Sequence, residues 1–272
     1  MGAKALIQEC SATVGGKMKR RILIALAGLC LTTGSAWAVP VGLELVLLVD
    51  VSGSVDATEY ALQKQGYVDA FNSAAVQATI LGSVGGAIAV TYVEWSGDGQ
   101  QQQVVNWTQI NSVGTAEAFA DAIEAGLRAF NGGNTAIQAA MSFGGGLFDN
   151  NGFEGARLVL DVSGDGADNN TSSCDTTANP RCGADIALGL GVNTINGLAI
   201  LGETGLLDYY EDNVASGTGG TAVAVNSFDD FGVAIQGKLQ REINAVPEPG
   251  TLLLLGSGLT GYVLRRRRRK LT

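Results

Sequence analysis

The feature of this chain that most constrains its fold is a series of short apolar runs that alternate with helix-forming segments. The first run, Leu43 to Val49, is apolar at all but one position, as expected for a central parallel strand that helices cover on both faces. Further strands are expected at 87–95, 103–107, 157–162, 194–201 and 222–225. Helices are expected at 55–74, 115–130 (with Thr115 as N-cap), 135–148, 184–190, 206–213 and 228–243. The alternation predicts an α/β fold: a doubly wound, mostly parallel sheet flanked by helices.

Composition narrows the possible functions. The 272 residues suit one sizeable core, and none of them is histidine, which excludes imidazole general bases, serine–histidine triads and histidine-built zinc sites. Between residues 39 and 250 lie all but one of the 26 acidic residues but only six of the 17 basic ones. Such an acidic surface repels nucleic acid and anionic membranes, so no nucleic-acid partner is expected.

The first 38 residues have the pattern of an export signal. From Met18, the expected start, the chain reads MKRRILIALAGLCLTTGSAWA: a basic stretch, then an apolar stretch, then the small-residue motif Ala36-Trp37-Ala38. These three parts in this order predict a secretory signal peptide that is cleaved after Ala38. Residues 1–17 are then an upstream segment.

The last 27 residues, 246–272, contain a second targeting segment, VPEPGTLLLLGSGLTGYVLRRRRRK. Its apolar part, 251–264, would be about 21 Å long as a helix, which is shorter than the roughly 30 Å of a bilayer's hydrocarbon core. The segment resembles the PEP-CTERM sorting signal of exopolysaccharide-producing Gram-negative bacteria. The resemblance implies transient inner-membrane anchoring through this short transmembrane segment, recognition and removal by an exosortase, and release to the cell surface or extracellular matrix. The alternative is an ordinary single-span anchor.

Two cysteines, Cys174 and Cys182, remain after the signal peptide. In a polar loop of an exported protein such a pair favours a disulfide, because a metal site would need more ligands nearby.

Three small oxygen-bearing residues, Asp50, Ser52 and Ser54, follow the first apolar run. In a doubly wound sheet they would lie at the carboxyl edge, where such folds bind ligands. Hard oxygen ligands suit Mg²⁺, Mn²⁺ or Ca²⁺ rather than Zn²⁺. Alternatively, Asp50 could cap the next helix and the serines could be turn residues.

The Asp-x-Ser-x-Ser pattern resembles the metal-ion-dependent adhesion site (MIDAS) of von Willebrand factor A domains. The resemblance implies such a domain over residues 39–245 and two further ligands, which Thr135 in NGGNTAIQAAM and Asp165 in RLVLDVSGDGADNN would supply. The bound ion would be a divalent cation, Mg²⁺ in preference to Mn²⁺ or Ca²⁺, with one coordination position left open for a carboxylate of a partner. The Cys174/Cys182 pair also fits a bacterial branch of this superfamily.

Other acidic residues near this edge admit competing interpretations. Residues 161–172 resemble the first half of an EF-hand loop, but Ser172 stands where the bidentate glutamate would be and a strand precedes the loop. Asp161 is therefore expected to be a hydrogen-bonded strand residue rather than a ligand. Glu94 and Asp168 could border the site, although a strand end beside a hairpin turn is the preferred interpretation of Glu94 and a loop position is preferred for Asp168.

These patterns predict an exported binding protein that uses its cation to hold an acidic protein or polysaccharide. The alternative is a structural module of the biofilm matrix with a structural ion. An enzyme is not expected. The motif also resembles haloacid-dehalogenase phosphatases, but Ser52 stands where their second aspartate would be, and no histidine is available as a base for a metal-dependent hydrolase.

Overall fold

The computed structural model describes residues 38–244. The predicted start and signal peptide, the short transmembrane segment and the basic tail lie outside the described residues. Within residues 38–244, no helix has the length and apolar character needed to cross a membrane.

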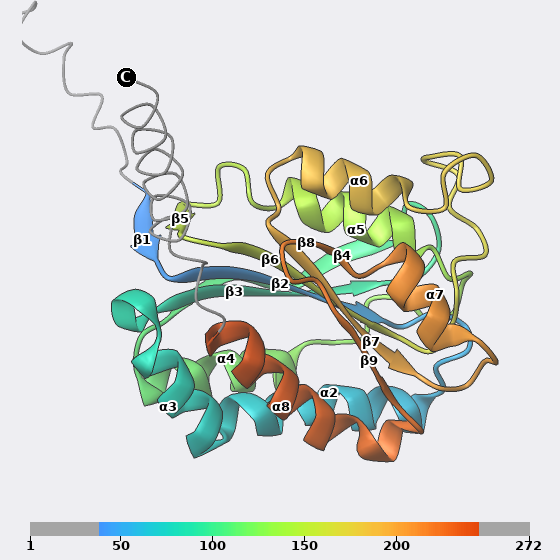
Figure 1. The fold of residues 1–272 in the computed structure, drawn as a ribbon. Coiled ribbons are helices and arrows are strands. Elements are labelled where there is room, and N and C mark those ends of the chain that lie inside the picture. Colours follow the sequence, from blue (N-terminus) through green and yellow to red (C-terminus); the bar gives the residue numbers. More distant parts are fainter. Residues whose placement is uncertain (1–37, 245–272) are drawn as a thin grey trace, which may run out of the picture. The chain divides into compact units, whose positions relative to one another are not determined.

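The centre of the fold is one twisted, mostly parallel sheet (Figure 1). Its strands, in spatial order, are β4 (Gln101–Ile110), β3 (Ile88–Trp95), β2 (Leu43–Asp50), β6 (Leu158–Gly164), β7 (Thr194–Ile200) and β8 (Ser216–Gly217). A further strand, β9 (Ala222–Val225), also pairs with β7. The β4 and β8 strands are antiparallel to their neighbours and all other pairs are parallel. The predicted fold class is confirmed.

Helices cover both faces of this sheet (Figure 1). One face carries α2 (Ala57–Asn72), α3 (Ala74–Gly82), α4 (Val113–Ala125) and α8 (Phe231–Asn244). The other carries α5 (Ile137–Gly146), α6 (Cys182–Gly189) and α7 (Leu206–Asn213). The remaining elements are the 3₁₀ turns η1 (Val84–Gly86) and η2 (Phe228–Asp230) and a small parallel sheet of β1 (Val39–Val41) and β5 (Phe153–Gly155).

The apolar run that predicted a central strand is buried along its whole length. Alternate side chains of β2 point to opposite faces: Leu45 and Leu47 pack in one core cluster, and Val46 and Leu48 pack in the other. Full burial of such a side chain stabilises the fold by about 1.5–3 kcal/mol. This strand therefore belongs to both hydrophobic cores, which holds its carboxyl end in a fixed position.

Helix boundaries differ from the prediction where side chains cap the ends. The N-cap of α4 is Ser112, not Thr115, because the Ser112 hydroxyl accepts from the Thr115 backbone N–H at 3.1 Å and Thr115 bonds back to the N-cap. The helix ends at Ala125, so the expected continuation to residue 130 is wrong. In α2 the N-cap is Asp56, which forms a capping box with Glu59.

Three strands, one α-helix and one 3₁₀ turn were not predicted, namely β1, β5, β8, α3 and η1. The three strands are only two or three residues long, so their sequences carry no period of their own. The helix α3 directly follows α2, and Ser73 serves as C-cap of the first and N-cap of the second. The sequence predicted one helix followed by a loop, whereas the structure has two helices that meet at a single capping residue.

Candidate metal-binding site

Three loops place the five predicted ligands at the carboxyl edge of the sheet. Asp50 is the last residue of β2, and Ser52 and Ser54 follow it. Thr135 precedes α5, and Asp165 follows directly after β6. Because β2 and β6 are adjacent and parallel, the two aspartates come together although 115 positions separate them in the sequence.

Hydrogen bonds connect the five side chains into one cluster. The Ser54 hydroxyl donates to Asp165 Oδ1 at 2.6 Å and lies 3.2 Å from the Ser52 Oγ. The Thr135 hydroxyl donates to the Ser52 Oγ at 3.4 Å, and the Ser52 backbone N–H donates to Asp50 Oδ1 at 2.7 Å. Asp50 and Ser52 are fully buried, whereas Ser54 is exposed, so the cluster extends from the core to the surface.

The carboxylate of Asp50 is the least satisfied group of this cluster. Its second oxygen, Oδ2, is buried and has no hydrogen-bond partner among the described residues. Burial and the neighbouring charge of Asp165 raise the pKa of Asp50 to about 7, and burial also raises the pKa of Asp165. A buried carboxylate whose charged form is disfavoured by burial and by a neighbouring carboxylate, without an ion pair to a described side chain, fits a site for an added cation.

Donor chemistry decides which ion the cluster fits. It offers two carboxylates and three hydroxyls, all of them hard oxygen donors of the kind that Mg²⁺ or Ca²⁺ prefers. Within residues 38–244 there is no group of three or more His, Cys, Asp or Glu side chains that could hold a metal ion. An ion at this edge would therefore depend on the serine and threonine hydroxyls.

Two glycines allow the loops to approach this closely. A Cβ atom on Gly164 would lie 2.7 Å from Asp50 Oδ2 and 2.8 Å from the hydroxyl of Tyr210, so a side chain there would displace the carboxylate. A Cβ on Gly53 would lie 3.0 Å from the Gly133 carbonyl, which accepts from the Gly53 N–H at 2.9 Å. The backbone itself thus sets the geometry of the cluster.

Arg128 supports the loop that carries the serines, a role that sequence reasoning missed. Its guanidinium donates to the carbonyls of Val51 at 3.1 Å and Val55 at 2.7 Å, and lies 5.0 Å from the ring centroid of Tyr60. A signal was present, because Arg128 is one of only six basic residues in a strongly acidic segment.

Glu94 and Asp168, both possible border residues, serve as structural hydrogen-bond acceptors. Glu94 is 1 % exposed and accepts from the Tyr60 hydroxyl at 2.9 Å and the Ala129 N–H at 2.6 Å. Asp168 accepts from the Gln138 N–H at 2.8 Å in the first turn of α5. Each carboxylate fixes a loop beside the cluster, and neither makes a hydrogen bond to the five predicted ligands.

The cysteine pair and Asp161 are found where they were predicted. Cys174 and Cys182 form a disulfide with a Cα–Cα distance of 6.1 Å, which closes the loop before α6. Asp161 lies within β6, is fully buried and contacts Lys238, so it is a strand residue that points away from the cluster.

Two sequence families match the chain. Residues 40–247 match the family described as "Protein of unknown function (DUF1194)". The chain belongs to this family. Residues 245–269 match the PEP-CTERM protein-sorting motif, which implies export, processing by an exosortase and a surface or matrix location. No curated protein sequence matches the chain.

Solved structures share its fold at low sequence identity. Proximal thread matrix protein 1 (PTMP1) from the mussel byssus is 16% identical, with a TM-score of 0.52 over 74% of this chain and 48% of that one. The pilus adhesin SpaC from Lactobacillus rhamnosus GG is 15% identical, with a TM-score of 0.54 over 75% of this chain and 30% of that one. A von Willebrand factor type A structure from Catenulispora acidiphila is 14% identical, with a TM-score of 0.47 over 75% and 43%.

These likenesses concern the fold. The chain spans about half the length of PTMP1 and less than a third of SpaC. One PTMP1 structure is described as having a zinc-occupied MIDAS motif. The likenesses to PTMP1 and SpaC support the predicted α/β architecture, a mostly parallel sheet flanked by helices. Any ligand or partner of this chain is a separate question.

Proposed function

We propose that this protein is an exported surface or matrix protein that binds an acidic protein or polysaccharide through a divalent cation. The ligands of the cation are Asp50, Ser52, Ser54, Thr135 and Asp165. The observation that carries this proposal is the joined cluster of five oxygen-bearing side chains, in which the buried Asp50 carboxylate has an unpartnered oxygen. A cation there offsets the repulsion between the two aspartates.

The predicted ligands range from buried to exposed, and this supports an ion that binds a partner rather than an ion enclosed in the protein. Ser54 is exposed and Asp165 is half-buried, so an ion held between them is reachable from outside. With two carboxylates as its only charged ligands, a divalent ion is not over-neutralised by the protein and still attracts an anionic group. A carboxylate of the partner is the group that best completes a shell of hard oxygens.

The ion is Mg²⁺ in this proposal, with Mn²⁺ and Ca²⁺ as alternatives. The zinc-occupied MIDAS motif of PTMP1 shows that a site of this kind accepts Zn²⁺ in that protein. Zinc therefore belongs among the ions tested. The activity proposed is binding and not catalysis, since the chain has no histidine to act as a base beside the ion.

Location and processing complete the proposal. The chain starts at Met18, leaves the cytoplasm by a signal peptide cleaved after Ala38, and is held at the inner membrane through residues 251–264 until an exosortase removes the tail. The von Willebrand factor A-like domain, residues 39–245, then reaches the cell surface or matrix. The PEP-CTERM match supports this route.

A binding assay with a variant of one ligand tests the proposal. The mature chain is applied to immobilised acidic exopolysaccharide and to cell-surface extract in Mg²⁺, in Zn²⁺ and in EDTA. We expect retention in the divalent ion, loss in EDTA, and loss in Asp50→Ala under all conditions. Asp121→Ala, which removes an exposed acid from α4, is the matched control and should bind like the wild type.

Binding that persists in EDTA and in Asp50→Ala would overturn the adhesion function. If Mg²⁺ raises the melting temperature of the wild type but neither surface retains it, the ion is structural and the protein is a matrix module.

A further inference from the structure

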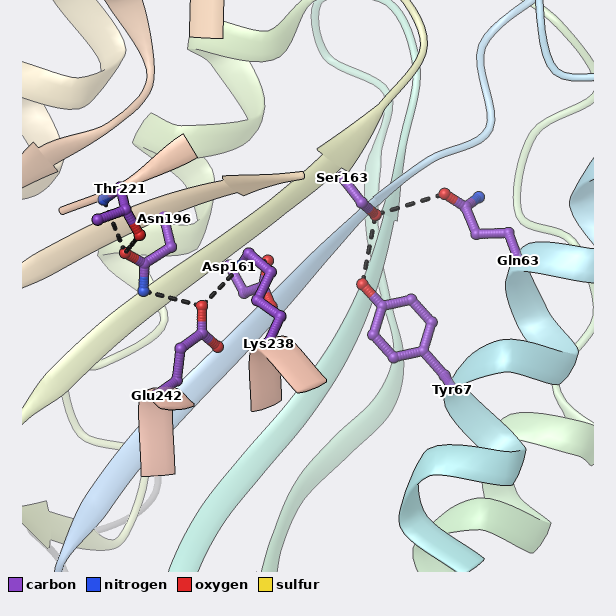
Figure 2. Close-up of polar contacts among 8 residues, drawn as sticks. All are labelled: Gln63, Tyr67, Asp161, Ser163, Asn196, Thr221, Lys238 and Glu242. Carbon is purple, nitrogen blue, oxygen red and sulfur yellow. Dashed lines mark hydrogen bonds and ion pairs between the residues drawn. The ribbon is translucent and has the colours of Figure 1, made fainter. Parts of the chain in front are cut away.

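A lysine is buried between two carboxylates beneath the sheet, on the face covered by α8 (Figure 2). The Lys238 Nζ contacts Asp161 Oδ1 of β6 and lies 2.6 Å from Glu242 Oε1, one turn further along α8. The three residues are 2 %, 0 % and 6 % exposed, respectively. The lysine amine thus touches a carboxyl group on the central sheet at a position with very little exposed surface.

As an ion pair this cluster is incompletely satisfied. Asp161 Oδ2 and Glu242 Oε2 are both buried without a hydrogen-bond partner among the described residues. A buried ion pair loses its hydration, and it compensates for this loss only when the remaining lone pairs are also bonded. The arrangement therefore leaves a driving force for any reaction that removes the two charges and the unpartnered oxygen.

Glu242 is placed to move protons within the cluster. Its Oε1 accepts from Lys238 and from the Asn196 Nδ2 at 2.8 Å, and Asn196 is in turn fixed by the Thr221 N–H at 3.1 Å. Burial and the charge of Asp161 raise the pKa of Glu242 to about 8, which favours its protonated form. An acid that touches the amine can donate a proton at one oxygen and accept one at the other.

Burial disfavours the ammonium form of Lys238, but the two carboxylates outweigh burial and raise its pKa. Attack by this nitrogen therefore requires that one ammonium proton first pass to Asp161 Oδ1, which the Nζ contacts, and this transfer leaves two neutral groups. In a dry site this transfer replaces two desolvated charges with none.

We propose that Lys238 and Asp161 join in an intramolecular amide bond, with Glu242 as the catalytic acid and base. The Lys238 nitrogen attacks Asp161 Cγ and forms the C–N bond, while Glu242 gives its proton to the departing hydroxyl and takes one from the nitrogen. The C–O bond breaks and one water molecule leaves. An ammonium and a carboxylate thus become an amide and water, Glu242 is regenerated, and neither an oxidant nor a cofactor is needed.

The water molecule that amide formation releases can leave the cluster through a neighbouring pocket. A pocket of about 860 Å³ borders the cluster, and both Lys238 and Glu242 line it, together with Asn196 and Thr221. Loss of this water to solvent favours the amide, because hydrolysis would need water to return beside a buried carbonyl.

The bond would connect the last helix to the central sheet. Lys238 lies in α8, which ends at Asn244, and the sorting motif begins at the next residue. A pull on the C-terminus acts first on α8, and a covalent bond to β6 resists its detachment. Such reinforcement suits a chain that is handled through its C-terminal signal.

Peptide mass spectrometry on the full chain tests this proposal. After denaturation, reduction and alkylation, trypsin should release residues 158–181 still joined to 182–241, because an amide at Lys238 blocks cleavage there. The joined species should be lighter than its two parts by one water molecule. Reduction is essential, since the Cys174–Cys182 disulfide connects the same two peptides.

Variants assign the roles. Lys238→Arg keeps the cation but should give no joined species, and Glu242→Gln should reduce it at least tenfold. Glu211→Gln, an exposed acid of α7, should leave it unchanged. Separate 158–181 and 182–238 peptides from wild-type protein with a cooperative melting transition would overturn the proposal. Equal yields in wild type and Glu242→Gln would overturn the role of Glu242.

Discussion

Two aspartates four residues apart mark two contrasting regions of this molecule. Asp165 lies just beyond β6, in an oxygen cluster with Asp50 and no ion pair to a described side chain. Asp161 lies within β6, in contact with the ammonium of Lys238. One region holds acids without a counter-charge, and the other holds acids around a lysine.

The difference shows how position on a strand separates a binding site from a structural one. The end of a strand opens onto loops and solvent, where an external ion and a partner have access. The middle of a strand lies under a helix, and only a side chain from that helix can reach it. In both regions a buried carboxylate has one oxygen without a hydrogen-bond partner. In the first proposal this oxygen binds a cation, and in the second the carboxylate becomes part of an amide bond.

The largest expected effect is the loss of the internal cation. Lys238→Met leaves Asp161 and Glu242 buried without their common partner, so we expect the free energy of unfolding to fall by about 3–5 kcal/mol. Urea denaturation followed by circular dichroism measures this fall. Arg241→Met, an exposed position of the same helix, is the control and should change the value by less than about 0.5 kcal/mol. If both substitutions lowered the free energy of unfolding by the same amount, Lys238 would not be a special counter-charge for the buried acids, and the contrast between the two regions would be wrong.

The pH dependence of stability should come next in size. Glu242 has a pKa of about 8 in the folded state against 4.5 as its ordinary value, so the folded protein holds this proton more tightly than the unfolded chain. The contribution is greatest below pH 4.5, falls as the pH rises above that value and is lost once the pH passes 8.

Denaturation midpoints of wild type and Glu242→Gln, measured from pH 5 to pH 9, isolate this effect because other buried carboxyls contribute equally to both. The stability of the wild type relative to Glu242→Gln should fall with rising pH, because only the wild type has a group that ionises at this position. A constant difference would mean that Glu242 is ionised throughout.

The smallest effect is expected from the external ion. Mg²⁺ at about 100 times its dissociation constant should stabilise the wild type by about 2.7 kcal/mol, because it binds only the folded state. Asp165→Asn should lose this stabilisation, whereas Asp161→Asn should keep it although its stability without Mg²⁺ is lower. Thermal melts with Mg²⁺ and with EDTA compare the two variants. A Mg²⁺ response that depends equally on both aspartates would contradict the separation of the two regions.

The elements of the fold that were predictable are those long enough to show a pattern of apolar residues in the sequence. The strand β2 was recognised from its continuous apolar run, and the helix α7 was recognised because a helix-forming segment fills the gap between two expected strands. The short strands β1 and β8 were not, because they exist only through pairing with a distant partner. Helix ends were misplaced at α4, where the capping bonds of Ser112 decided the boundary.

The candidate site was predictable for a different reason. Asp50, Ser52 and Ser54 are adjacent in the chain, and the family resemblance supplied Thr135 and Asp165. The structure brings these five side chains into contact, while their role as metal ligands remains a prediction. The rarity of basic residues marked Arg128 as unusual, but its partners were not predictable, because it binds backbone carbonyls more than 70 positions away.

The sequence by itself determined the layered α/β architecture, the disulfide pair and the C-terminal sorting motif. Each of them can be recognised from residues that are close together in the chain or from the order of segments along it. Only the tertiary structure decided which aspartate faces a lysine and which faces solvent. Periodicity is a property of neighbours along the chain. The counter-charge of a buried carboxylate depends on distances through space, and Lys238 and Asp161 are 77 residues apart until the helix packs on the sheet.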